Sequence, residues 1–279
     1  YSGSQGLHQV YLGVGAEPLR NLSVGVNASY LWGGYTKYVT NTYSDAYVNT
    51  LQRTYTAEVR SYKLDFGLQY TQPLSAKDQV TLGLTYSLGH SLNADPELSV
   101  IKNNSQLAVA DTTRFRISNA LDLPHTFGVG AVYSHNGQLM VGADYQLQKW
   151  GSLDYPQYSD QGGYGLQSGL LKDRHKVVLG ADYCRGERHR GFLSRLHYRA
   201  GIGYATPYFT INGQDGPKEI SASLGLGIPI VNSYNNRSML NISAQWVRRE
   251  ASSMLTENTF RINIGFTFNE RMFAKFKVE

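Results

Sequence analysis

One-by-one alternation of apolar and polar residues is the feature of this sequence that most restricts its fold. Between Leu22 and Trp32 every second residue is apolar or aromatic, and the residues between them up to Ser29 are serine, glycine or asparagine. A period of two residues is typical of a β-strand whose two faces meet different surroundings. The sequence has no run of about 18 apolar residues, the length that a membrane-spanning helix needs.

The same alternation recurs along the whole chain and predicts an all-β protein with eleven antiparallel strands. In each predicted strand one face is apolar, while the other is rich in glycine, serine and other polar residues. The predicted strands cover residues 10–17, 22–32, 62–70, 80–89, 127–134, 139–148, 177–183, 195–204, 219–230, 240–246 and 260–268.

Short and long connections alternate between the predicted strands. Residues 135–137, His-Asn-Gly, carry the Asn-Gly pair of a two-residue hairpin turn. Outer-membrane barrels have short periplasmic turns and longer extracellular loops, so this sidedness predicts a transmembrane antiparallel β-barrel. The short connections are 17–21, 72–78, 135–137, 185–192 and 231–237, and the longer polar ones are 33–60, 90–124, 149–174, 206–217 and 248–258.

Aromatic residues mark both ends of the predicted strands. Trp32, Trp150 and Trp246 lie at extracellular ends, whereas Tyr70 and Tyr133 lie at periplasmic ends. Such girdles are typical of membrane–water interfaces. The mean hydropathy of −0.36 does not argue against a membrane protein, because half of every barrel strand is polar. We therefore expect a location in the bacterial outer membrane, with outer-membrane lipid around the wall.

Residues 1–279 are expected to form a single barrel domain. The first and the last predicted strand both run toward the periplasm, and eleven is an odd number. Single-chain bacterial barrels usually have an even number of strands. We therefore expect at least one further strand to precede residue 1, so that the sequence is part of a longer barrel.

Several classes of function have no support in the composition. Cys184 is the single cysteine, and no paired histidine spacing indicates a metal site or a cofactor. The net charge of +5 comes from scattered Lys and Arg, which does not indicate nucleic-acid binding. A nucleophile with a base at motif spacing is missing, so an enzyme is not expected.

Two parts of the chain resemble a known family. Residues 2–11, 21–27 and 30–33 resemble the mid-barrel segment of the FadL-like outer-membrane transporters, the long-chain fatty acid transporter or OMPP1 family. Residues 260–266 with 269–271 resemble the ending of divergent members. The resemblance implies a barrel of fourteen strands, an N-terminal plug, and hydrophobic substrates that leave sideways through the wall. Three strands and the plug would then precede residue 1.

Charged residues on the inward faces of the predicted strands are the candidate binding residues. One interpretation is that they hydrate the lumen and pair across strands. The other is a clamp for an anionic head group, because Arg binds carboxylates in a bidentate manner; an Asp on a neighbouring strand could satisfy the same arginines. The ligand-binding candidates are Arg195, His197, Arg199, Lys63 and Arg261, among inward charges that also include Asp65, Asp144, Asp182 and Glu219.

The predicted extracellular segments 35–55 and 91–120 mix apolar and polar residues. They are interpreted either as self-packed strand tips or as a surface that captures a hydrophobic ligand or docks a partner protein. The predicted function is passive outer-membrane transport of a hydrophobic small molecule, such as a fatty acid. The first alternative is a non-transporting barrel subunit of a larger outer-membrane complex for assembly or secretion, and the second is a polar diffusion pore. A transporter should show an apolar pocket, a subunit a blocked lumen and a broad contact surface, and a pore a wet channel.

Overall fold

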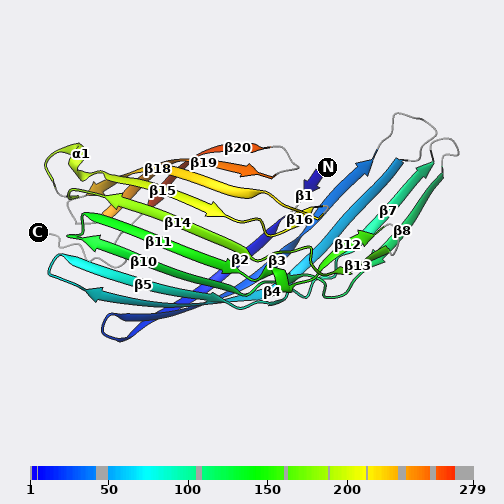
Figure 1. Cartoon of the computed structure of the whole chain (residues 1–279), viewed down its shortest axis with the longest axis horizontal. Helices are drawn as coiled ribbons and strands as arrows, with labels where there is room; N and C mark the ends of the chain where they lie inside the picture. Colours follow the sequence, from blue (N-terminus) through cyan, green and yellow to red (C-terminus); the bar gives the residue numbers. More distant parts are fainter. Residues whose placement is uncertain are drawn as a thin grey trace, which may run out of the picture.

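A computed structural model of the protein describes residues 2–4, 6–41, 50–104, 109–159, 163–187, 189–211, 213–231, 237–251 and 256–267. These residues form a long antiparallel sheet that curls into a wall (Figure 1). Four of its strands, β3, β4, β7 and β8, project beyond the rest of the wall at one end (Figure 1). Predicted residues in the ranges 42–49, 105–108 and 268–271, including Phe268, lie outside the described residues.

The prediction of eleven antiparallel strands is confirmed. Each predicted segment coincides with one long strand, and each long strand pairs with the next one along the chain. The wall consists of β2 (Leu7–Leu19), β3 (Leu22–Asn41), β4 (Thr50–Pro73), β5 (Asp78–Ser87), β10 (Thr126–His135), β11 (Leu139–Gln148), β14 (Arg174–Tyr183), β15 (His197–Ala205), β18 (Lys218–Val231), β19 (Arg237–Glu250) and β20 (Glu257–Thr267).

Short elements fill the connections at the extracellular end. β1 (Ser2–Ser4) continues the line of β2 along β3, after a bend where the positive φ of Gly33, 130°, brings that glycine against the Gly6 carbonyl. The other short elements at this end are β6 (His90–Ser91), β7 (Glu97–Asn104), β8 (Val109–Arg116), β9 (Asp122–Leu123), η1 (Trp150–Ser152), β12 (Tyr155–Ser159), β13 (Gly163–Gln167), β16 (Thr210–Ile211) and β17 (Gln214–Asp215). The helical turn α1 (Phe192–Arg195) lies at the opposite, periplasmic end, between β14 and β15 (Figure 1).

The apolar face of the wall is not covered by protein. Strand register aligns one apolar or aromatic residue from each of eight successive strands into a continuous row, and every member of that row is at least 37% exposed. A bare apolar surface of this extent indicates contact with lipid. The row contains Val24, Leu68, Leu84, Val129, Tyr145, Val177, Tyr204 and Ile220.

The turns confirm the predicted sidedness. Asn136 and Gly137 have φ angles of 55° and 65°, as a hairpin turn with two left-handed central residues requires. The connections at this periplasmic end are short, whereas residues 88–125 and 149–173 form longer excursions at the other end.

Residues 33–60 are not a polar loop, which corrects one prediction. β3 and β4 continue through most of this range, and they are 20 and 24 residues long. A tilted strand needs only about 9–11 residues to cross a membrane. The two strands therefore rise well beyond the bilayer, and β7 adds to the free side of β4 there, followed by β8.

The polarity of the two faces inverts where β4 leaves the membrane. Below this point Phe66 and Tyr62 face outward, and Lys63 and Asp65 face inward. Beyond it the outward positions are polar, while Ala57 and Val59 on the inward face are buried. A sheet with its apolar face turned inward needs a covering layer, and that layer shapes the mouth of the barrel.

Within the described residues the wall is open along one line. β2 pairs with β3 and β20 pairs with β19, and the two outer edges do not pair with each other. The predicted strand 195–204 also starts later than expected. Arg195 belongs to the helical turn α1, and β15 begins at His197.

Candidate functional site

Two of the predicted cationic residues meet on the inward face of β15. Arg199 lies opposite Asp182 of β14 in the strand register, and its Nε donates a hydrogen bond to Asp182 Oδ2 at 2.7 Å. His197 Nδ1 lies 2.8 Å from the other oxygen of the same carboxylate. The Arg199 Nη1 donates to Asn241 Oδ1 on β19 at 2.7 Å. A polar network therefore ties three strands of the wall together.

Asp182 is the carboxylate that this pair of cations contacts. His197 is only 14% exposed, and its Nε2 faces Glu187 Oε1 at 3.4 Å. The sequence left open whether Arg199 meets a ligand or an Asp from a neighbouring strand, and the structure places that Asp on it. An anionic ligand at this site would have to replace Asp182 as the partner of Arg199.

The other three candidate residues lie elsewhere. Lys63 pairs with Asp65 on β4. The guanidinium of Arg195 lies over the Phe192 ring within α1, 6.0 Å from the ring centroid. Arg261 is exposed on the edge strand β20, opposite Gln245. The five residues therefore do not form one site, and the inward charges are spread around the wall.

Grooves on the inner face of the wall have linings that mix polar and apolar residues. One, of about 410 Å³, crosses β4, β5, β10 and β11 and is lined by Gln69, Asp144 and Gln146 together with residues such as Val132. Another, of about 350 Å³, lies between β15 and β20 beside Arg199 and Asn241.

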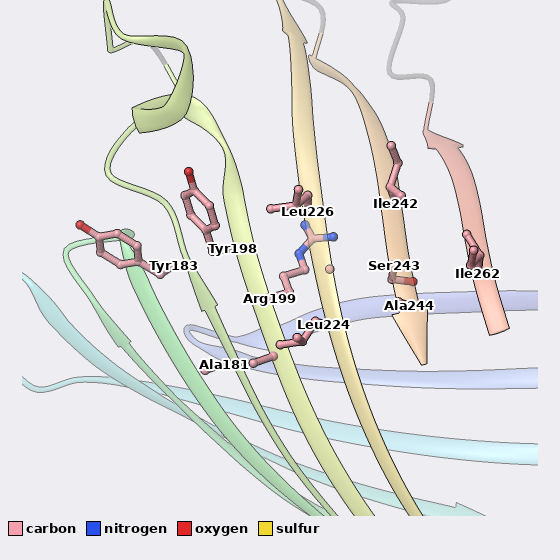
Figure 2. A pocket seen from close by; sticks show the side chains of 12 residues that line it. Ala181, Tyr183, Tyr198, Arg199, Leu224, Leu226, Ile242, Ser243, Ala244 and Ile262 are labelled. Atoms are coloured by element: carbon pink, nitrogen blue, oxygen red, sulfur yellow. The ribbon is translucent and has the colours of Figure 1, made fainter. Parts of the chain in front are cut away.

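Apolar grooves lie on the outer face instead. One of about 620 Å³ crosses β14, β15, β18, β19 and β20 (Figure 2). Its floor follows a row of mostly small residues in strand register, which includes Ala181, Ala200 and Ala244. Tyr183 and Tyr198 lie opposite each other on neighbouring strands along its side (Figure 2). A second outer groove, of about 610 Å³, crosses β3, β4, β5, β10 and β11.

The mouth of the barrel carries a small hydrophobic core that sequence reasoning missed. Segments from both ends of the 88–125 excursion pack on the inward face of β3 and β4. Leu31 and Val59 come from the strands, and Leu92 and Ala94 from the excursion, with Ala94 fully buried. Leu121 and Leu123 complete the cluster. These residues fill the inner side of the wall at its extracellular end.

A second covering layer comes from the β12–β13 hairpin, which lies beside β7 and β8 in Figure 1. Rings of the hairpin meet rings of the projecting strands: Tyr164 contacts Tyr55 with centroids 6.3 Å apart, and Tyr158 contacts Phe115 at 6.0 Å. The guanidinium of Arg53 lies 4.7 Å from the Tyr158 centroid. Burial raises the pKa of the Tyr155 and Tyr164 hydroxyls above the usual value of tyrosine.

The projecting strands and this hairpin thus form a two-layered extracellular platform, defined as β3 and β4 beyond Trp32 and Arg60, with β7, β8, β12 and β13. Leu98 and Val100 are buried inside it. The sequence allows two interpretations of segments 35–55 and 91–120, either self-packed strand tips or a surface that binds a ligand or a partner. Leu98 and Val100 agree with the first interpretation, because they are buried within the platform. Val109, by contrast, is 59% exposed.

The described residues offer little for metal binding or for thiol chemistry. No group of three or more His, Cys, Asp or Glu residues that could hold a metal occurs among the described residues. Cys184 is 3% exposed at the end of β14, and its Sγ contacts the Arg195 carbonyl. Burial raises the pKa of this thiol, which disfavours the reactive thiolate. No helix in the described part of the chain is long and apolar enough to cross a membrane.

Comparison with known proteins gives one family and several similar structures. A family model described as BamG matches residues 1–279. The monoaromatic hydrocarbon channel CymD has a TM-score of 0.70 at 13% identity, over 97% of this chain and 75% of that one. The Ralstonia pickettii toluene transporter TbuX has a TM-score of 0.66 at 14% identity, over 96% and 69%. A FadL homologue of Pseudomonas aeruginosa has a TM-score of 0.62 at 16% identity, over 90% and 61%. No curated protein matches the chain significantly.

At these identities the similar structures establish the fold. The predicted FadL-like barrel architecture is confirmed, and the exposed apolar wall with its aromatic ends places it in an outer membrane. The neighbours with an activity in their description are a channel and a transporter, not enzymes, in agreement with the sequence prediction.

Proposed function

The chain belongs to the BamG family, and from this premise we propose that it is a non-enzymatic barrel subunit of an outer-membrane assembly complex. The family name points to a Bam-related context. The match of the BamG model to all 279 residues is the observation that carries the proposal. Partner proteins of the outer membrane are thus the expected ligands.

The geometry of the mouth supports this function. Apolar side chains from residues 88–125 fill the inner face of β3 and β4, which narrows a path through the lumen. The platform rises from the same two strands and presents a rigid polar surface outside the membrane. Broad, ordered surfaces of this kind are suited to protein contacts.

Loss of the protein should therefore slow the assembly of other barrels. In a strain that lacks it, pulse-labelled outer-membrane proteins are expected to reach their heat-modifiable folded form more slowly, while uptake of toluene and oleate stays normal. Expression of the protein with the buried Leu98→Asp change, which disrupts the platform core, should not restore assembly, whereas the exposed Val109→Thr control should. Normal assembly in the deletion strain would contradict the proposal.

Passive transport of a hydrophobic small molecule is the second candidate. The likeness of the fold to CymD and TbuX favours it. The apolar outer grooves offer a surface onto which a substrate could leave sideways. A fatty acid is one proposed substrate, and its carboxylate would bind Arg199 and His197 in place of Asp182.

Uptake into proteoliposomes tests this second function. Radiolabelled toluene and oleate should enter faster than into vesicles without protein if the barrel transports them. The His197→Gln, Arg199→Ala double variant should slow oleate and leave toluene unchanged if these two side chains hold the carboxylate. Equal oleate uptake by the variant and the unchanged protein would contradict carboxylate binding at this site. Uptake no faster than into vesicles without protein would contradict transport.

A further inference from the structure

We propose that the outer groove across β3, β4, β5, β10 and β11 is a binding site for one lipid of the outer leaflet with an anionic phosphate head group. The groove has a volume of about 610 Å³, and its lining includes Val26, Phe66, Leu84 and Val129. These residues belong to the lipid-facing side of the wall. An acyl chain fits an apolar groove of this kind by burying its own apolar surface.

The extracellular end of this groove carries two matched Tyr–His pairs. The Tyr86 hydroxyl lies 2.8 Å from His125 Nδ1, and the Tyr145 hydroxyl lies 2.8 Å from His175 Nδ1. Both tyrosines line the groove, and both imidazoles are exposed beside it. The Tyr86 and His125 rings stack with centroids 5.9 Å apart, and the Tyr145 and His175 rings are tilted with centroids 6.1 Å apart. The same arrangement thus occurs twice, on different strands, at one end of one groove.

Hydrogen bonding fixes which nitrogen of His125 is available. The backbone N–H of Gly89 donates to His125 Nδ1 at 3.2 Å, so this nitrogen acts as an acceptor. A neutral imidazole whose Nδ1 accepts carries its proton on Nε2. Among the described residues no group hydrogen-bonds to Nε2 of His125 or of His175. The Tyr86–His125 pair therefore offers a free N–H donor at the extracellular end of the groove.

A cation completes the polar end. The backbone N–H of Lys149 donates to the His125 carbonyl at 2.9 Å, and its ammonium pairs with Asp173, two residues before His175. The lysine side chain is 42% exposed, so its ammonium is accessible beside Asp173. Lys149, the free donor of His125 and the exposed ring of His175 give this end of the groove a polar character that suits an anion.

The other outer groove, which crosses β14, β15, β18, β19 and β20, lacks this combination. It is as large and as apolar, but its aromatic end is formed by Tyr183 and Tyr198, and the Tyr198 hydroxyl donates to the Leu193 carbonyl. Arg199 contributes to the lining, but its guanidinium is bound by Asp182 and Asn241. The lining of this other groove contains no histidine, so an apolar groove on this wall does not necessarily have imidazole groups at its end.

The groove across β3 to β11 combines an apolar surface for an acyl chain with polar side chains and a lysine at its extracellular end. This combination favours a lipid with an anionic head group.

Native mass spectrometry of the full chain in a mild non-ionic detergent tests the site. Titrated phosphatidylglycerol should bind with one retained copy, and phosphatidylcholine should bind at least about fivefold more weakly. The His125→Gln, His175→Gln double variant should lose about tenfold in phosphatidylglycerol affinity, the size expected for a lost hydrogen bond to a charged group. Leu84→Trp, which fills the groove and keeps both imidazoles, should weaken it as well.

His8→Gln is the matched control. His8 lies near the start of β2 and stacks on Trp32 with centroids 5.7 Å apart, and neither residue lines the groove. This variant should bind phosphatidylglycerol like the unchanged protein. Equal binding of the two lipids, or full affinity in the double variant with normal heat-modifiability, would overturn the proposal. Displacement of the lipid by millimolar inorganic phosphate alone would indicate a free-anion site and would also overturn it.

Discussion

At the scale of single residues, the wall is held by a few polar contacts among many small side chains. The sequence indicated that Arg199, His197 and Asp182 share the inward face, because a period of two places them there. It could not show that one carboxylate serves both cations, since that depends on the register between β14 and β15. For Arg195 the sequence was misleading. The alternation of apolar and polar residues continues through this position and predicts a strand, but the residue belongs to the helical turn α1.

Asp182→Ala should destabilise the barrel by about 1–3 kcal/mol, because it removes the partner of Arg199 Nε and His197 Nδ1 in a partly buried place. The urea midpoint of the protein in lipid vesicles measures this. Asp215→Ala, which removes the exposed ion pair with Lys172, is the control and should cost less. Equal losses for both variants would contradict the role given to the network.

Gly137→Ala should cost about 1 kcal/mol through the backbone alone. A Cβ added there meets no atom within 4 Å, so crowding plays no part, but φ is 65°. The same urea midpoint detects the change. Gly83→Ala also has open space around its Cβ and is not left-handed, so it should be close to neutral.

At the scale of elements, strand existence was predictable and strand length was not. Alternation identified all eleven wall strands because lipid and lumen impose opposite polarity on successive residues. β4 was cut short at residue 60 because the apolar positions change face there. The signal was present: Tyr55, Ala57 and Val59 alternate with polar residues in the inverse phase. Such an inversion indicates a strand that leaves the membrane and acquires a protein core.

Val59→Ala should loosen the mouth without unfolding the wall. Val59 is 1% exposed in the cluster with Leu31 and Leu92, and loss of its two methyl groups costs about 2 kcal/mol. Hydrogen exchange should rise in residues 88–125 while β10 and β11 keep their protection. Val109→Ala, at an exposed position, should leave both regions unchanged.

Acid should release the same excursion through Asp95. The backbone N–H of Asn119 and the Arg116 guanidinium bind its carboxylate at 2.9 and 2.7 Å, and they hold its pKa below the usual value. Because the folded pKa is lowered, this stabilisation is complete above the unfolded value of about 3.9 and is lost as the pH falls further. Limited proteolysis of residues 92–121 should therefore increase below about pH 4. Asp95→Asn should remove most of that pH dependence.

At the scale of the whole molecule, the wall separates hydrocarbon from a polar interior. Leu82 lies outward near the middle of β5 and is 51% exposed, so Leu82→Arg should cost about 2–4 kcal/mol in a bilayer. Thr81→Arg, on the inner face of the same strand, should be tolerated. Folding yields into vesicles distinguish the two, and equal yields would mean that Leu82 does not face lipid. This arrangement could be predicted from the sequence. The hydrophobic core at the mouth could not, because its residues come from segments far apart in the chain.

β3 and β4 run from the periplasmic turns to the far tip of the platform as uninterrupted hydrogen-bonded ribbons. Because this register continues without a break past Gly33, we expect a movement of one region to be transmitted to the other. A partner that tilts the tip outside the cell would thereby strain the lipid-embedded strands directly, and a distortion of those strands would be felt at the tip.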